Sequence, residues 1–317
     1  MKYDVKLMLC VIVLMFFSAY IQAAEKSASQ TAVANPVPVI PGNEILLFDI
    51  IEQTQGELRL SVGTNITNNP GYDSQPKFSH DGQVIFYTHA VTNDSSTQMD
   101  IYQYTLANGE TKPYMSTPLS EYSPTPMPHQ AGLSVVQVDE KGDQYLVILN
   151  NELNKDYQSQ RYSDLKQVGY FNWTLKAQNW SFILNDSSGG DLYFMGQNKQ
   201  ASLLEKNVGR TFVTDAEHQR IYYVNKNSTP WRINSRADKE KAEDLMALPL
   251  GVEDFTLDSK GRFWAGRDNT LFVSTDQTRW YIVAEFTDPN LHQISRLTSS
   301  PKADKIAIVF AEKTLSE

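Results

Sequence analysis

Short apolar runs separated by polar turns recur along most of this chain. In residues 75–88, QPKFSHDGQVIFYT, the turn SHDG separates two apolar runs, and a third run, DIYQYTL, follows at residues 100–106. Runs of this length that are bounded by turn residues are typical of β-strands joined by hairpins. The pattern therefore predicts a small antiparallel sheet in this stretch.

The same unit of turn and strands returns five more times. The six units start 41 to 48 residues apart. A period in the forties with several short strands per unit is the signature of a β-propeller, in which small sheets pack around an axis. The units begin near Gln75, Ser123, Gly169, Arg210, Glu253 and Ser295.

The last unit predicts how the ring closes. Its final apolar run, KIAIVFAE at residues 305–312, comes near the end of the chain and leaves its sheet two strands short. Two spare runs, EILLFDI at 44–50 and ELRLSVG at 57–63, precede the first unit. Pairing them with the last unit would remove open sheet edges. The predicted fold is therefore an all-β, six-bladed β-propeller over residues 44–317, closed by pairing the N-terminal strands with the C-terminal blade.

Two other interpretations of the pattern fit less well. A β-sandwich also contains many short strands, but it does not explain the period. Residues 236–248, RADKEKAEDLMAL, have a helical composition, and we nevertheless expect a charged loop and an outer strand there.

The N-terminal segment, residues 1–23, is typical of a secretory signal peptide. Lys2 and Lys6 precede an apolar run at 7–21, and small residues follow it. This three-part plan predicts cleavage after Ala23, a periplasmic or secreted location and no stable membrane insertion afterwards. The alternative is an uncleaved anchor, because the apolar run is close to the shortest that can span a bilayer. Residues 24–43, rich in Ala, Ser and Pro, are expected to form a linker or a lead-in strand.

Composition narrows the classes of function. The 317 residues are 41% hydrophobic and 21% charged, as in an ordinary globular protein. The formal net charge of −9 makes nucleic acid an unsuitable partner, because an acidic surface repels phosphate groups. Cys10 is the only cysteine and lies in the predicted signal peptide. The mature chain would therefore have no disulfide, no cysteine nucleophile and no thiolate metal site.

Residues 75–106 resemble the WD40-like repeats of the TolB family. Those repeats combine Pro-x-aromatic-Ser with Asp-Gly, an apolar strand and Asp-Ile-Tyr. The resemblance extends over about residues 44–312 as architecture and implies a TolB-like propeller. TolB also has an α/β domain before its propeller, and this chain has no room for one, so it resembles a propeller-only relative. The matching residues are Pro76, Phe78, Ser79, Asp81, Gly82, Asp100, Ile101 and Tyr102.

The sequence lacks the motifs of several common catalytic sites: a Gly-x-Ser-x-Gly elbow, a His-Glu-x-x-His helix and an EF-hand loop. Residues 251–266, GVEDFTLDSKGRFWAG, resemble a strand of the six-bladed calcium lactonases of the gluconolactonase type. In those enzymes an acidic residue at the inner end of a strand binds the ion, which implies that role for Glu253 or Asp254. Matching Glu and Asn ligands are not found in the other units. A calcium-dependent lactonase-type hydrolase is therefore the alternative function.

Propellers offer a concave surface at the mouth of the axial channel, near the N-terminal ends of the innermost strands. Arg and Tyr at those ends are residue types that anchor interfaces well. We expect a non-catalytic binding or scaffold propeller that engages a protein partner at this mouth, with no cofactor. A small-molecule or glycan binder that uses Tyr122 and Tyr170 is a further alternative. The predicted mouth residues are Asp73, Glu121, Tyr122, Tyr170, Arg210, Glu253, Asp254, His292 and Arg296.

Overall fold

The computed structural model describes residues 42–312, apart from positions 55, 94–95, 116, 130–131, 151–157, 175, 186–188, 216, 218, 238 and 289–290. The predicted signal peptide, and the predicted linker up to residue 41, lie outside the described residues. The described residues form 24 β-strands and no helix, which confirms the all-β prediction. A helix that could span a bilayer is accordingly not found in this part of the chain.

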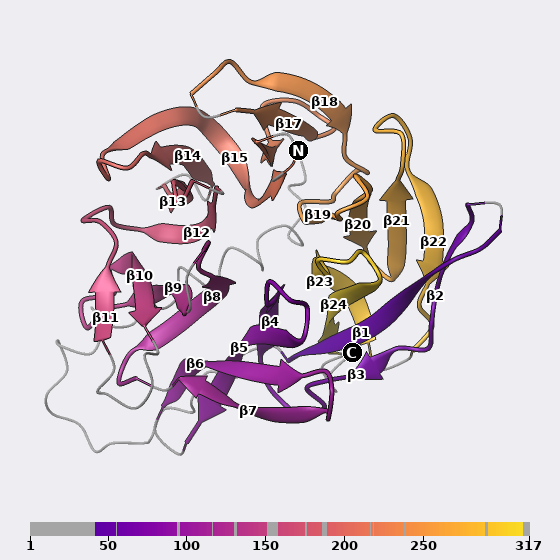
Figure 1. The fold of residues 1–317 in the computed structure, drawn as a ribbon, viewed down its shortest axis with the longest axis horizontal. Helices are drawn as coiled ribbons and strands as arrows, with labels where there is room; N and C mark the ends of the chain where they lie inside the picture. Colours follow the sequence, from indigo (N-terminus) through magenta and orange to yellow (C-terminus); the bar gives the residue numbers. More distant parts are fainter. Residues whose placement is uncertain are drawn as a thin grey trace, which may run out of the picture.

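The strands form antiparallel sheets that are arranged around a common centre (Figure 1). Three of the sheets have four strands each, hydrogen-bonded in chain order. The first contains β4 (Asp73–Phe78), β5 (Val84–Thr92), β6 (Thr97–Thr105) and β7 (Glu110–Met115). The second contains β8 (Ser120–Pro126), β9 (Leu133–Val138), β10 (Gln144–Asn150) and β11 (Gln158–Arg161). The third contains β19 (Phe255–Leu257), β20 (Phe263–Arg267), β21 (Thr270–Ser274) and β22 (Tyr281–Glu285).

A fourth sheet has seven strands because one long strand serves two groups of partners. β15 pairs with β14 through its first part, where Ala201 lies opposite Met195, and with β16 through its last part, where Asp215 lies opposite Arg220. β18 confirms the outer strand expected within residues 236–248. The sheet contains β12 (Val168–Trp173), β13 (Asn179–Leu184), β14 (Gly190–Met195), β15 (Ala201–Asp215), β16 (Arg220–Asn225), β17 (Arg232–Arg236) and β18 (Glu243–Ala247).

The fifth sheet joins strands from both ends of the described chain. β1 pairs antiparallel with β24, from Asn43 opposite Ala311 to Asp49 opposite Lys305. The spare N-terminal runs predicted at 44–50 and 57–63 therefore share a sheet with the last unit. The sheet contains β1 (Asn43–Glu52), β2 (Leu58–Leu60), β3 (Thr64–Asn65), β23 (Leu291–Ser299) and β24 (Lys305–Glu312).

Six hydrophobic clusters in the described part of the chain fill the spaces between neighbouring groups of strands. Phe48 of β1 and Trp264 of β20 belong to one cluster, and Ile45 of β1 and Ile85 of β5 belong to another. A third cluster lies within the seven-stranded sheet, between the groups on either side of the middle of β15. Burying a large apolar side chain stabilises a fold by about 1.5–3 kcal/mol. These clusters therefore hold the sheets together face to face.

The turn between β4 and β5 shows how the repeated turn residues act. Gly82 has a φ of +72°, which is unfavourable for residues with a Cβ atom. The carboxylate of Asp81 accepts hydrogen bonds from the Ser79 hydroxyl at 2.6 Å and from the Gln83 N–H at 3.0 Å. The Asp-Gly pair is therefore explained by the geometry of the turn.

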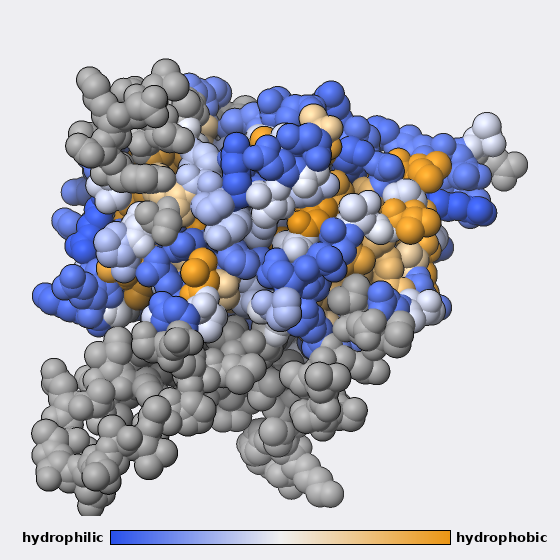
Figure 2. All heavy atoms as spheres, turned by 90° about the horizontal axis from the view of Figure 1, so that it is seen from below, coloured by the Kyte–Doolittle hydropathy of each residue, from blue (hydrophilic) through white to orange (hydrophobic). Residues whose placement is uncertain are grey.

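The outer surface is mainly polar on the face shown in Figure 2. Apolar side chains on this face gather near the projecting hairpin of β1 and β2. Exposed apolar residues of the molecule include Val62, Tyr281 and Ile282.

Candidate ligand channel

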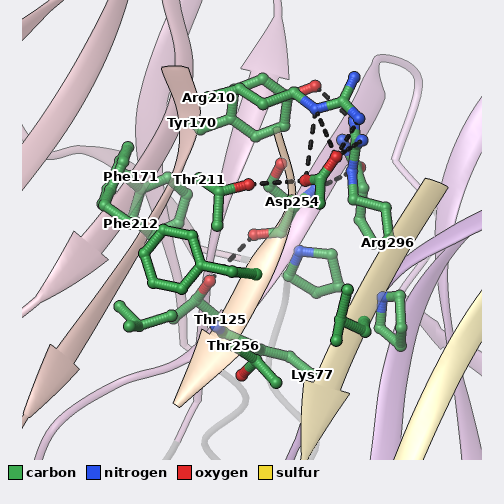
Figure 3. A pocket seen from close by; sticks show the side chains of 17 residues that line it. Lys77, Thr125, Tyr170, Phe171, Arg210, Thr211, Phe212, Asp254, Thr256 and Arg296 are labelled. Atoms are coloured by element: carbon green, nitrogen blue, oxygen red, sulfur yellow. Dashed lines mark hydrogen bonds and ion pairs between the residues drawn. The ribbon is translucent and has the colours of Figure 1, made fainter. Parts of the chain in front are cut away.

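A cavity of about 100 Å³ lies at the centre of the ring, between the inner strands of all the sheets (Figure 3). Its lining comes from β4, β8, β12, β15 and β23, and from β19 with the residue before it. All nine predicted mouth residues lie on these six strands or directly before them. The cavity is therefore the place where the structure can bring these residues together.

Several inner strands are interrupted by a residue with a positive φ. The φ is +57° at Gln75 in β4 and +54° at Ser123 in β8, and the pairing register shifts at both positions. Such a shift marks a β-bulge, which changes the side-chain alternation of a strand. The side-chain oxygen of Gln75 accepts hydrogen bonds from the Ser123 N–H and the Thr88 hydroxyl, both at 2.9 Å. The two bulges are thus tied to each other beside the cavity.

A network of charged side chains lies at one end of the cavity and is centred on Asp254 (Figure 3). Its carboxylate accepts hydrogen bonds from Arg210 Nε at 3.1 Å and from the Thr211 hydroxyl at 2.6 Å. Arg210 Nη2 contacts the same carboxylate, and Arg296 Nη1 lies 3.3 Å from it. One carboxylate therefore serves two guanidinium groups that come from different sheets.

This network reaches across the centre of the ring. Arg296 Nη2 of β23 donates to the hydroxyl oxygen of Tyr170 in β12 at 2.8 Å, and its guanidinium carbon lies 5.4 Å from the Tyr170 ring centre. β12 and β23 lie on opposite sides of the ring (Figure 1). Arg210 also donates to the backbone oxygen of Ser295 at 3.1 Å. Charge-assisted bonds of this kind hold the side chains in one arrangement.

Both acidic residues before β19 are held in the ionised form. Burial opposes ionisation of Asp254, but Arg210 and Arg296 outweigh it and keep the pKa of this carboxyl below its usual value. Burial likewise opposes ionisation of Glu253, and Arg210 with Lys226 keeps its pKa low. Lys226 Nζ lies 2.6 Å from the Glu253 carboxylate, which also accepts the Arg210 backbone N–H at 3.0 Å. These carboxylates therefore already have cationic partners.

Asp73 and Glu121 lie outside the cavity lining and are fully buried. Asp73 contacts His89 Nδ1 at 2.8 Å, and burial raises the pKa of its carboxyl. Glu121 accepts a hydrogen bond from Gln137 Nε2 at 2.9 Å and another from the Thr117 hydroxyl. Burial raises the pKa of Glu121 to about 7, and its Oε2 atom has no hydrogen-bond partner in the described part of the chain.

Tyr122 and His292 also lie outside the lining. Tyr122 is half-buried against an apolar cluster that includes Val136, and burial raises the pKa of its hydroxyl. The Nδ1 atom of His292 is buried, and no described residue forms a hydrogen bond with it. Of the nine predicted residues, the structure brings Tyr170, Arg210, Asp254 and Arg296 together at the cavity, with Glu253 beside them.

Sequence reasoning missed Gln75, Lys77 and Thr211 as lining residues. The sequence does contain a signal for Lys77, because it occupies the unspecified position of the Pro-x-aromatic motif, between Pro76 and Phe78, whose side chains are buried. Strand alternation places such a residue on the other face of the strand. Tyr72 lies near Arg296: burial raises the pKa of its hydroxyl, and Arg296 opposes that rise. Sequence reasoning did not place Tyr72 near the site, and the sequence offers no comparable signal for it.

A metal centre is not evident in the described residues, where no three His, Cys, Asp or Glu side chains gather closely enough to hold an ion. The carboxylates that the lactonase resemblance implies as calcium ligands are those of Glu253 and Asp254. Calcium would have to displace Lys226 or the two arginines from them. The arrangement as it stands can bind a polar or charged group.

A scan against protein-family models and a search of the curated proteins give no match. Solved structures do match. A protein of Agrobacterium tumefaciens assigned as a TolB aligns with a TM-score of 0.65 at 15% identity, over 87% of this chain and 100% of the other. The fold is that of a β-propeller.

Two further solved structures resemble the chain with TM-scores above 0.5. A gluconolactonase of Xanthomonas campestris gives a TM-score of 0.56 at 10% identity, over 89% of this chain and 99% of the other. TolB of Acinetobacter baumannii gives 0.52 at 11% identity, over 94% of this chain and 69% of the other. Identities this low show the fold alone, because one fold hosts many functions.

Proposed function

We propose that this chain is a non-catalytic binding propeller, periplasmic or secreted, that engages a protein partner at the channel mouth. The observation that carries the proposal is the network of Tyr170, Arg210, Asp254 and Arg296, in which side chains from β12, β15, β23 and the residue before β19 are fixed at one end of the central cavity. Preorganised side chains lose little entropy on binding, and Arg and Tyr are the types that dominate interface energies. The location follows from the predicted signal peptide.

We also infer that the ring has six blades over residues 44–317, as in a propeller-only relative of TolB. The seven-stranded sheet counts as two blades that share β15, and a hydrophobic cluster lies between its two parts. Pairing of β1 with β24 then completes the sixth blade from both ends of the chain. The count of six core clusters in the described residues supports this division.

The contacts favour binding over the two alternatives. A calcium lactonase needs carboxylates that are free for the ion, whereas Glu253 and Asp254 are engaged by Lys226, Arg210 and Arg296. A glycan site built on Tyr122 and Tyr170 needs both rings in the cavity, and only Tyr170 lines it.

The experiment is site-specific photo-crosslinking in the native compartment. A photo-reactive residue at Gln293, exposed near the start of β23 and close in sequence to Arg296, should give a discrete protein adduct. The same residue at Glu217, exposed in the turn between β15 and β16, should give none. The Gln293 adduct should disappear in an Arg296→Gln background and persist with Arg59→Gln, which alters an exposed ion pair.

Two results would contradict the proposal. One is the absence of any adduct that depends on Arg296. The other is stoichiometric calcium binding together with lactone hydrolysis, both lost in Glu253→Gln, which would favour the hydrolase.

A further inference from the structure

Lys77 differs from the other charged residues of the cavity because it stands apart from the arginine network. It follows the β4 bulge and lines the cavity beside Thr125 and Thr256, at the end away from the arginines (Figure 3). Within the described residues, the structure gives its ammonium group no ion-pair or hydrogen-bond partner. Two other repeats carry threonine at the position of Lys77. Thr125 follows Pro124 in β8, and Thr256 follows Phe255 in β19. The fold therefore accepts a threonine hydroxyl at this level of the channel, and it does not require the positive charge of Lys77.

An unpaired ammonium group in a half-buried position has an energetic cost. Removal from water disfavours the charged form, and burial lowers the pKa of Lys77. Lys226 shows the usual solution, because its side chain is 16% exposed and it pairs with Glu253 at 2.6 Å. Retaining Lys77 without such a carboxylate is explained if a ligand supplies the missing charge.

The balance of charge in the cavity points in the same direction. Its lining contains three cationic side chains, Lys77, Arg210 and Arg296, and a single carboxylate, that of Asp254. This carboxylate is already shared by the two arginines. The channel is therefore locally positive inside a chain with a formal net charge of −9. A positive cavity with low-dielectric walls attracts anions.

We propose that Lys77 is the anchor for a carboxylate group that a ligand inserts into the channel, with the Thr256 hydroxyl beside it. This inference rests on the proposed binding function and names the chemistry of the group that enters. A single ammonium matches a monoanion, whereas a phosphate dianion would leave charge uncompensated at this level. The carboxylate comes either from a free organic acid or from the C-terminus of a peptide segment, and the test separates these sources.

The test measures binding of small probes to the purified full chain by NMR of lysines carrying ¹³C-dimethyl groups. The Lys77 signal is assigned by its loss in Lys77→Met. The probes are sodium acetate, inorganic phosphate, and N-acetyl-triglycine with either a free or an amidated C-terminus. We expect acetate or the free-acid peptide to shift the Lys77 signal, and the amidated peptide to leave it unchanged. Response to acetate indicates a free acid as the source, and response to the peptide alone indicates a chain terminus.

Variants test whether the lysine itself is responsible. Calorimetric affinity for the responding probe should fall by about tenfold or more in Lys77→Met, the effect expected from losing one charge-assisted hydrogen bond. Lys112→Met, which alters an exposed lysine on β7, should bind as the parent does. Equal binding by Lys77→Met and the parent, no carboxylate binding at all, or tighter binding of phosphate than of acetate would each overturn the inference. An Arg296-dependent crosslink at Gln293 would still be seen if only the carboxylate site were wrong.

Discussion

The two sides of the channel differ in whether their charged side chains have oppositely charged partners. On the arginine side, formed by Tyr170, Arg210, Asp254 and Arg296, each charged group contacts an oppositely charged group from another segment of the chain. On the lysine side, which is formed by β4 and β8, Lys77 lines the cavity without a charged partner among the described residues. Asp73 and Glu121 lie on the same two strands but outside the cavity lining, where Asp73 contacts His89 and Glu121 has neutral partners. Burial raises the pKa of both carboxyls there and lowers that of Lys77.

The contrast shows that a charged residue of the cavity lining finds an oppositely charged partner only where a neighbouring sheet supplies one. Arg210 and Asp254 stand 44 residues apart and form a pair only because β15 lies next to β19. Glu121 has neutral partners, Thr117 and Gln137, and keeps an oxygen without any partner among the described residues. Four substitutions test this difference.

The largest effect is expected on the arginine side, from Asp254→Ala. This change leaves two buried guanidinium groups without their shared carboxylate, and breaking a buried pair in this way costs about 3–5 kcal/mol. Urea unfolding should therefore show a much lower free energy of unfolding. Glu57→Ala, which breaks an exposed pair with Arg59, should cost less than about 1 kcal/mol. Equal losses from the two changes would remove the distinction between the channel network and the surface.

On the lysine side, the leading effect is a pH dependence that originates at Glu121. Its folded pKa of about 7 exceeds the ordinary 4.5, so the folded state holds the proton to a higher pH than the unfolded state does. The resulting stability is complete below about pH 4.5 and is lost as the pH rises to about 7. At about 1.4 kcal/mol per pKa unit, the change amounts to about 3 kcal/mol at most.

Glu121→Gln should remove this part of the pH dependence. Free energies of unfolding at pH 5 and pH 8 should differ less in the variant than in the parent, because the amide does not ionise. Glu217→Gln, at an exposed position, should leave the parent's difference unchanged. An unaltered difference in Glu121→Gln would mean that Glu121 is ionised in the fold throughout this range.

A smaller loss is expected from Gln75→Ala. The change removes the acceptor of the Ser123 N–H and the Thr88 hydroxyl, and an unsatisfied partly buried donor costs about 1–3 kcal/mol. We expect a loss of about 2 kcal/mol in urea unfolding, against almost none for the exposed Gln83→Ala. An unchanged free energy of unfolding in Gln75→Ala would show that the two bulges hold their shape independently.

The smallest effect should come from Tyr170→Phe. The ring stays over the Arg296 guanidinium, so only the hydrogen bond across the channel is lost, at about 1 kcal/mol. Thermal unfolding should detect a modest decrease, while Tyr281→Phe at an exposed position should leave the melting temperature unchanged. A decrease as large as that of Asp254→Ala would mean that this single bond holds the whole network.

Many of the strands could be predicted from the sequence because their signals are local. Apolar runs and turns such as Asp81-Gly82 depend on neighbouring residues, and β1 and β24 lie where their apolar runs predict. The continuous course of β15 was not predicted, because nothing local distinguishes a strand that spans two groups of partners from two separate strands.

The site was harder to predict because β-bulges change which face a side chain occupies. Glu121 precedes the bulge at Ser123 and is buried, whereas Thr125 follows it and lines the cavity. Asp73 and Lys77 are divided by the bulge at Gln75 in the same way. Repeat alignment locates the end of a strand, but a positive φ at Gln or Ser is not evident from residue type. The alignment therefore found the correct strands and only some of the residues that face the channel.

The pairing of β1 with β24 has a mechanical consequence. The two strands are antiparallel, and Asn43 lies opposite Ala311, so the outer ends of both strands meet at the same end of the ladder. Tension applied to those two ends loads the hydrogen bonds one after another, because the bonds run perpendicular to the strands. The paired residues of β1 and β24 then separate in order, from Asn43 and Ala311 towards Asp49 and Lys305.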